Sequence, residues 1–253
     1  MSDAFNSPFI VFAASLFVQC LAAYCGYLLR PKERSAGTAA PGDLDTIHAA
    51  ALTLLGLIIG FTFSMAVGRY DQRKNYEEEE ANAIGTEYSR ADLLPGDTAA
   101  KVRSLLSKYI NQRIKFYVIR DQRRIGQIDA DTAVLQNELW STASRAAVAQ
   151  PTPAMALVVS GMNDVLNSQG YTQAAWLNRI PIGAWALMEA IAIACNLLLG
   201  YKLVGRGTRV LFILPMITSI AFFLIADIDS PRRGVIRVIP QNLILQAQAM
   251  KAQ

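Results

Sequence analysis

The chain lacks most of the side chains on which catalytic and metal sites depend. It has one histidine, His48, so a multi-histidine zinc site and a haem held by two histidines are excluded, and we expect no histidine-based catalytic triad. Its three cysteines, Cys20, Cys25 and Cys195, lie in apolar runs without metal-ligand spacing, where cysteine behaves as a small apolar residue. We therefore predict no metal site and no catalytic thiol.

Common enzyme motifs are also absent from the sequence. There is no G-x-x-x-x-G-K-S/T phosphate loop, no G-x-G-x-x-G after a strand, no G-x-S-x-G elbow and no C-x-x-C pair. We expect a protein that is not an enzyme, with no catalytic residues and no cofactor.

Charged side chains are scarce as well. They make up 17% of the residues, whereas 53% are hydrophobic, which is typical of a chain with much of its length in lipid. The formal net charge is +4, but the basic residues lie mostly beside apolar runs, where Lys and Arg anchor helix ends at headgroups. The expected partner is the lipid bilayer, and we predict no nucleic-acid partner.

Four apolar runs are long enough to cross a bilayer as helices. The first has about 22 residues without a charge, enough for a hydrocarbon core of roughly 30 Å. An acidic residue, Asp3, stands where a signal peptide would carry basic ones, so this run is interpreted as a span. The predicted spans are residues 8–29, 46–68, 181–203 and 210–226.

The segment between the second and third spans, residues 70–179, is polar and predicted to be helical. Because no glycine or proline lies between Gly68 and Glu80, we expect the second span to continue out of the membrane as one long helix. No strand alternation is evident, and apolar residues recur at helical spacing. They include Ala81, Ile84, Tyr88, Val102, Leu106, Ile110, Val158, Met162 and Val165.

These elements predict an all-α membrane protein. Four transmembrane helices form two hairpins, residues 1–69 and 180–227, with a polar helical bundle, 70–179, between them and a tail, 228–253, suited to packing on the bundle. With four spans, both termini and the bundle share one side of the membrane. Basic residues flank the spans on both sides, so charge alone does not predict which side is cytoplasmic.

The second span carries a stripe of small residues at every fourth position. Such a stripe lets another backbone approach closely, and packing against a neighbouring helix is its most common use. Repeated around an oligomer axis, the same helix would also line a pore. The stripe consists of Gly56, Gly60, Ser64 and Gly68. The candidate pore or constriction residues beside it are Ile59, Thr62, Phe63 and Ala66.

Glu189 lies roughly two turns inside the third span, where an ionised carboxylate is unfavourable unless it is hydrogen-bonded, protonated or in contact with water. It indicates either ion or proton handling or a structural hydrogen bond to a neighbouring helix. Asn196 lies on the same helix face as Glu189. His48, at the start of the second span, is interpreted as an interfacial residue.

Four consecutive carboxylates follow the second span on its predicted extension. They are Glu77, Glu78, Glu79 and Glu80. In an oligomer they would form an acidic vestibule that concentrates cations, and otherwise they would be a solvated helix face. Asp227 and Asp229, at the end of the fourth span, are interpreted as interfacial ion pairs with nearby arginines rather than as a divalent-cation site.

Three runs of the sequence resemble a bacterial family of integral membrane proteins described as bestrophin-like. They are LLGLIIGFTFSMAVGRYDQRKN from Leu54 to Asn75, EEANAIGTEYSRADLLP from Glu79 to Pro95, and IADIDSPRRGVIRV from Ile225 to Val238. The likeness extends from about His48 into the tail. It names a family without a settled activity.

The resemblance implies a bestrophin-like layout. Bestrophins are ion channels in which five subunits surround a pore, with apolar side chains of one span at a narrow neck and a helical region between the second and third spans in the cytosol. By this likeness Ile59 and Phe63 are candidate neck residues, and the chain forms a homo-oligomer, a pentamer, in the bacterial inner membrane. The bundle and both termini would then be cytoplasmic.

The sequence therefore predicts an oligomeric membrane protein that passes small ions through a pore lined by the second span. The alternative is a non-conducting membrane-anchored sensor or scaffold whose helical bundle binds a partner. A coupled transporter, in which Glu189 takes and releases a proton or an ion during each cycle, is the third interpretation.

Overall fold

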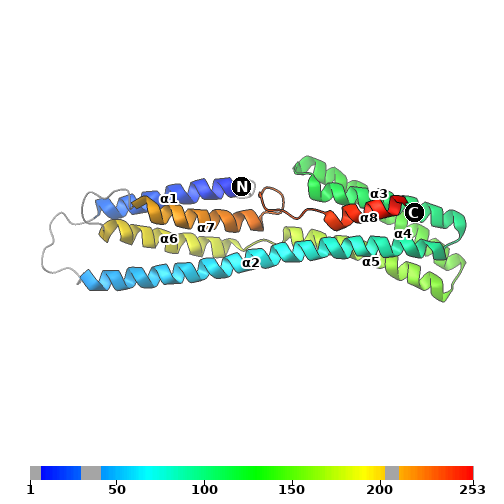
Figure 1. Cartoon of the computed structure of the whole chain (residues 1–253), viewed down its shortest axis with the longest axis horizontal. Helices are drawn as coiled ribbons and strands as arrows, with labels where there is room; N and C mark the ends of the chain where they lie inside the picture. Colours follow the sequence, from blue (N-terminus) through cyan, green and yellow to red (C-terminus); the bar gives the residue numbers. More distant parts are fainter. Residues whose placement is uncertain (1–6, 30–40, 203–210, 253) are drawn as a thin grey trace. The chain divides into compact units, whose positions relative to one another are not determined.

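The computed structural model describes residues 7–29, 41–202 and 211–252. These ranges are built of helices and contain no strand, which confirms the all-α prediction (Figure 1). The elements are α1 (Pro8–Leu28), α2 (Pro41–Arg90), the short 3-10 helix η1 (Ala91–Leu93), α3 (Gly96–Val118), α4 (Gln122–Ala149), α5 (Pro153–Leu177), α6 (Ile182–Lys202), α7 (Ile213–Asp229) and α8 (Gln241–Ala252).

The second helix, α2, is a single helix of 50 residues. It begins at Pro41, before the second predicted span at residues 46–68, and continues through the polar sequence that follows that span, as the lack of a helix breaker predicted. It ends at Arg90, and η1 leads into Leu94, whose backbone is extended. Proline at position 95 favours this extended conformation, because its ring disfavours a helical residue before it.

The chain folds into two compact units, each assembled from segments that are far apart in the sequence. The first unit contains Met1–Arg69 and Arg179–Arg237, and the second contains Tyr70–Asn178 and Val238–Gln253. The first unit includes α1, α6 and α7, the second includes α3, α4, α5 and α8, and α2 contributes to both. The C-terminal segment therefore belongs to the same unit as the polar helices.

Three segments of the described residues are long and apolar enough to cross a membrane. They lie in α1, within Gly42–Leu93 and within Pro153–Lys202, which includes α6. The helix α7 is also strongly apolar and has 17 residues. The end of the third predicted span and the start of the fourth fall on residues 203–210, outside the described residues.

Two buried glycines allow α1 and α6 to pack with their backbones in contact. A Cβ atom at Gly26 would collide with the carbonyl group of Leu197, and one at Gly200 would collide with the carbonyl oxygen of Ala23. Helix pairs in a membrane gain little from excluding water, so they depend on such close van der Waals contact at small residues. The glycines therefore set how closely α1 and α6 approach.

Gly200→Ala is expected to destabilise the first unit by about 1–3 kcal/mol, because the added methyl group has no space against α1. Gly183→Ala is the matched control on the same helix, since a Cβ at Gly183 meets no neighbouring atom. Thermal unfolding of both variants in detergent measures the difference. Equal melting temperatures would contradict the close contact.

The second unit buries an apolar core between the polar part of α2 and the helices α3, α4, α5 and α8. From the C-terminal segment, Leu243 and Met250 join this core, and the Tyr88 hydroxyl donates a 3.1 Å hydrogen bond to the carbonyl of Met250. Most apolar positions predicted from helical spacing are buried here, namely Ala81, Ile84, Tyr88, Val102, Leu106, Ile110, Val158, Met162 and Val165, whereas Val134 on α4 is 65% exposed. Burial of amphipathic faces thus holds the unit together.

Candidate functional site

The apolar part of α2 has one face covered by the chain itself. Leu55, Thr62 and Ala66 are buried, and their spacing of seven and four residues places them on one side of the helix. Ile59 is half-buried beside them. Two of the four candidate pore residues, Thr62 and Ala66, are therefore packed inside the first unit.

The opposite face of this part of α2 is open. Gly56, Gly60, Ser64 and Gly68 are exposed, and a Cβ atom on any of the three glycines would meet no neighbouring atom. Phe63, next to this face, has 38% of its side chain exposed. Within the described residues, the small-residue stripe is thus not used for packing inside the chain and is available to another molecule.

A chain of hydrogen bonds links α1, α6 and α7 inside the first unit. The Ser15 hydroxyl donates to Oε2 of Glu189 at 2.9 Å, and Nε2 of Gln19 donates to Oγ of Ser15 at 2.7 Å. Oε1 of Gln19 in turn accepts hydrogen bonds from Nδ2 of Asn196, at 3.3 Å, and from the Thr218 hydroxyl. The two polar residues predicted in the third span are therefore connected through α1.

This hydrogen-bonded network retains unused acceptors. Among the described residues of this network, Oε1 of Glu189 and Oδ1 of Asn196 are buried without a hydrogen-bond partner. An unsatisfied buried polar atom is unfavourable by roughly 1–3 kcal/mol. A bound molecule with a hydrogen-bond donor would remove that penalty at the atom it reaches.

Three residues of the network were not singled out from the sequence. Ser15 and Gln19 stand four residues apart in an otherwise apolar helix, which places them on one face, and this spacing is a signal that could have found them. Thr218 had no comparable signal, because its hydroxyl also bonds the carbonyl of Leu214 in its own helix at 2.8 Å. Such local bonds are common for threonine in apolar helices.

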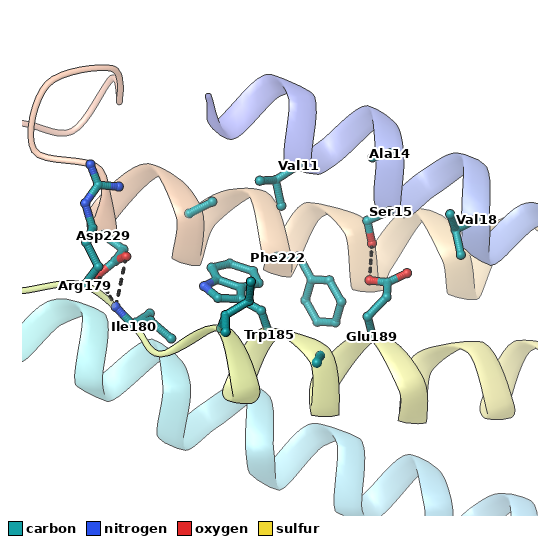
Figure 2. Close-up of a pocket in the computed structure, with 13 residues that line it drawn as sticks. Val11, Ala14, Ser15, Val18, Arg179, Ile180, Trp185, Glu189, Phe222 and Asp229 are labelled. Carbon is teal, nitrogen blue, oxygen red and sulfur yellow. Dashed lines mark hydrogen bonds between the residues drawn. The ribbon is translucent and has the colours of Figure 1, made fainter. Parts of the chain in front are cut away.

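A cavity of about 630 Å³ opens beside Glu189 in the first unit. Figure 2 shows Glu189 and Ser15 toward one end of the cavity and Arg179 toward the other, with the rings of Trp185 and Phe222 between them. The two rings meet edge to face with their centres 6.3 Å apart. The cavity therefore has aromatic walls between two polar ends.

The two aspartates at the end of α7 hold backbone amides. Asp227 accepts the N–H groups of Val235 at 2.7 Å and Ile236 at 2.8 Å, which closes the loop after α7. Both oxygens of Asp229 lie 3.3 Å from the N–H group of Ile180. Asp227 therefore caps the backbone of this loop, and its interpretation as an interfacial ion pair stays a prediction. The described part of the chain has no cluster of three metal-ligating side chains.

The acidic run on α2 divides into two buried and two exposed residues. Glu78 and Glu79 are exposed, whereas Glu77 and Glu80 are buried. The three-residue spacing of the buried pair places both on the inward face of the helix. Glu80 forms an ion pair with Arg113 in which neither side chain is exposed. Glu78 and Glu79 are therefore the carboxylates of this run that face solvent.

The two buried carboxylates tie other helices to α2. Glu77 accepts hydrogen bonds from the N–H group of Leu243 at 2.9 Å and from Nδ2 of Asn242 at 2.7 Å. Burial raises the pKa of Glu77 above its usual value, and these hydrogen bonds oppose the rise. Glu80 also accepts from the Thr172 hydroxyl at 3.2 Å and the Tyr117 hydroxyl at 3.4 Å. Both carboxylates thus stabilise the second unit.

Glu87 is a further buried carboxylate, which the sequence did not single out. Its side chain is 0% exposed, its Oε2 lies 3.9 Å from Nη1 of Arg90, and neither oxygen has a hydrogen-bond partner among the described residues. Burial raises the pKa of Glu87 to about 8, with Arg90 opposing the rise and Asp164 adding to it. Gly161 leaves space for this carboxylate, because a Cβ there would collide with it.

His48 lies buried near the start of α2. Its Nδ1 atom is 3.4 Å from Nζ of Lys202 at the end of α6, and Lys202 also forms an ion pair with Asp45. This contact joins the ends of two helices in the first unit.

Comparison with known proteins decides the family. Residues 44–243 match the Bestrophin-like domain, which is well over half of the chain. The chain belongs to the Bestrophin-like family. The resemblance noted in the sequence is thereby confirmed, and the protein is a helical membrane protein of this family.

Solved structures of a bacterial bestrophin homologue from Klebsiella pneumoniae share the fold. One, of a substituted form, aligns with a TM-score of 0.67 and 14% identity over 96% of this chain and 97% of that chain. Another, phased on zinc, aligns with a TM-score of 0.65 and 14% identity over 95% and 98% of the two chains. No curated protein matches significantly. A likeness at such low identity shows a shared fold and does not transfer the roles of individual residues.

Proposed function

We propose that this Bestrophin-like protein is an oligomeric channel that passes small ions through a pore lined by the apolar part of α2. In this proposal α1, the apolar part of α2, α6 and α7 are four transmembrane helices in two hairpins. The polar second unit and both termini lie in the cytoplasm, and the assembly is a pentamer in the bacterial inner membrane, as the resemblance to bestrophins implies.

The open face of α2 is the observation that carries the proposal. A row of small residues on the face of a membrane helix indicates contact with another helix rather than with lipid tails, because only small residues let a second backbone approach closely. Gly56, Gly60 and Gly68 are exposed here without neighbours. A second copy of the chain packed on this face would place the adjoining side chains toward a shared axis.

The proposed constriction consists of Ile59 and Phe63. Thr62 and Ala66 are buried within their own subunit, so they support the pore helix from behind. Ile59 is half-buried and Phe63 is 38% exposed at the edge of the open face. Apolar rings of this kind gate channels by restricting water and ions at a narrow point.

The proposed vestibule carries the exposed carboxylates of the acidic run. Glu78 and Glu79 lie on the continuation of the pore helix beyond the apolar part. Repeated in each subunit, they would raise the local concentration of cations. The buried Glu77 and Glu80 are occupied in holding the second unit together.

Phe63→Ala is expected to increase ion flux severalfold, because a smaller side chain widens an apolar constriction. The measurement is flux through purified protein in liposomes, in KCl and then in salts of large impermeant ions. Phe61→Ala is the matched control, since Phe61 lies two residues away on a different face and is 65% exposed.

The same measurement separates the channel from its rival. If the protein is a non-conducting sensor or scaffold, flux will not exceed that of empty liposomes at any pH or calcium concentration. Equal changes of flux in Phe61→Ala and Phe63→Ala would instead argue against a constriction at Phe63.

A further inference from the structure

We propose that the cavity beside Glu189 binds an amphipathic organic cation, namely a protonated amine attached to an apolar or aromatic body. The site lies within the first unit and goes beyond the proposed channel function, because binding is measured without ion flux. The inference rests on the shape of the cavity, the carboxylate of Glu189 in its lining and the net charge of that lining.

The cavity has the size and walls of a small-molecule site. Pockets that bind small molecules are usually about 300–1,000 Å³ in volume, with apolar and aromatic walls and a few polar groups. This cavity measures about 630 Å³, and Trp185 and Phe222 line its middle. From Ile182 to Glu189 the wall formed by α6 extends about 10 Å, at 1.5 Å per residue.

The carboxylate of Glu189 has one occupied and one free oxygen. Oε2 accepts the Ser15 hydroxyl at 2.9 Å, whereas Oε1 is buried and has no hydrogen-bond partner in the described ranges. Figure 2 shows the carboxylate one helical turn beyond Trp185, with the oxygen that Ser15 does not bond pointing away from that ring. Oε1 is itself enclosed, so the contribution of the carboxylate to the cavity is its charge: an ammonium group there would supply the opposite charge that a carboxylate in an apolar setting requires.

The charge of the lining selects a cation over an anion. Two carboxylates, Glu189 and Asp229, and one guanidinium, Arg179, line the cavity, which gives a formal charge of −1. Figure 2 places Arg179 beside Asp229, so these two charges offset each other at the far end. The uncompensated charge is that of Glu189. A fatty acid or an anionic lipid headgroup would place a second negative charge against it.

The aromatic walls favour a particular shape of occupant. With its ammonium group at Glu189, the body of the molecule would lie against Trp185 and Phe222, where an aromatic ring can pack edge to face as these two rings do with each other. A phenyl ring on a four-carbon chain matches the length of this wall. 4-Phenylbutylamine is therefore a suitable probe.

The test is equilibrium binding of radiolabelled 4-phenylbutylamine to the full chain in nanodiscs, with uptake by empty nanodiscs subtracted. Unlabelled 4-phenylbutanol and 4-phenylbutyrate serve as competitors with the same body and a neutral or anionic head. We expect the amine to bind most tightly and the carboxylate least. Glu189→Gln should weaken amine binding by about 10- to 100-fold and leave the alcohol nearly unchanged.

Two further variants keep the test decisive. Glu79→Gln removes an exposed carboxylate outside the cavity and should leave amine binding unchanged. Ala186→Phe fills the cavity from an exposed lining position and should abolish binding of both amine and alcohol, even if Glu189→Gln does not fold. Amine uptake equal to that of empty nanodiscs, as for a cavity filled by lipid tails, would overturn the proposal. So would unchanged binding in Ala186→Phe or tighter binding of the carboxylate than of the amine.

Discussion

Replacing Arg113 by methionine is expected to lower the free energy of unfolding by about 3–5 kcal/mol. Arg113 and Glu80 form an ion pair in which neither side chain is exposed. Methionine fills most of the space of the arginine stem but leaves the Glu80 carboxylate buried without its counter-charge. The remaining hydrogen bonds from Thr172 and Tyr117, at 3.2 and 3.4 Å, do not neutralise that charge.

The loss should be concentrated in the second unit. Chemical denaturation of the full chain in detergent measures the free energy, and hydrogen exchange of the α3 and α5 amides locates the change. Arg103→Met is the matched control, because Arg103 pairs with Asp92, whose side chain is 70% exposed. We expect that control to lose less than about 1 kcal/mol. A comparable loss of free energy in both variants would show that the buried ion pair contributes no more to stability than the exposed one.

A double variant of the ion pair separates the contribution of its charges to stability from the contribution of side-chain packing. Glu80→Gln combined with Arg113→Met removes both charges of the pair and should recover part of the stability that Arg113→Met loses, because no uncompensated buried charge remains. If the double variant is less stable than the sum of the single changes, packing rather than charge holds α3 against α2.

The stability of the second unit is expected to fall as the pH rises from about 4.5 to about 8, because of Glu87. Below this range the carboxyl group is protonated in both the folded and the unfolded chain. Within the range the unfolded chain has released the proton, whereas the folded chain, whose Glu87 pKa is raised to about 8, still binds it. The unfolded state then binds fewer protons, so each rise in pH favours unfolding.

Glu87→Gln should therefore raise the free energy of unfolding at pH 8 by about 2–4 kcal/mol and have little effect at pH 4.5. Gln keeps the size of the side chain and cannot ionise. The charged groups beside it are Arg90 and Asp164.

The measurement is the free energy of unfolding as a function of pH, from chemical denaturation followed by circular dichroism. Glu79→Gln, an exposed carboxylate eight residues earlier on the same helix, is the control and should leave the pH profile unchanged. A profile in Glu87→Gln that has the same slope as that of the unchanged protein would rule out Glu87 as the titrating group.

Several features could be predicted because they depend on residues close together in the chain. The apolar runs that became α1, the start of α2, α6 and α7 are local properties, as is the lack of a breaker that makes α2 continuous through Gly68. The buried positions of the second unit followed from helical periodicity. The division of the acidic run was not predicted, because all four glutamates were assigned together to a vestibule or a solvated face, although the same helical period separates the buried Glu77 and Glu80 from the exposed Glu78 and Glu79.

Other features depend on which distant segments share a buried space. The bond from Ser15 to Glu189 joins residues 174 positions apart, and that from Thr218 to Gln19 joins residues 199 apart, so no local pattern indicates them. In the sequence, nothing distinguishes Glu87 from a glutamate on the surface of a helix. In the structure, Gly161 of α5 lies against its carboxylate.

By itself the sequence determined the helices, their apolar spans and the membership in a bestrophin-like family, since hydrophobicity, breakers and motifs are encoded over a few neighbouring residues. Only the tertiary structure decided which face of α2 is open. It also decided that only one oxygen of the Glu189 carboxylate accepts a hydrogen bond, and where a cavity remains beside this residue. Burial and pairing arise from packing between segments far apart in the chain, and that packing sets the desolvation and the free hydrogen-bonding capacity of each polar group.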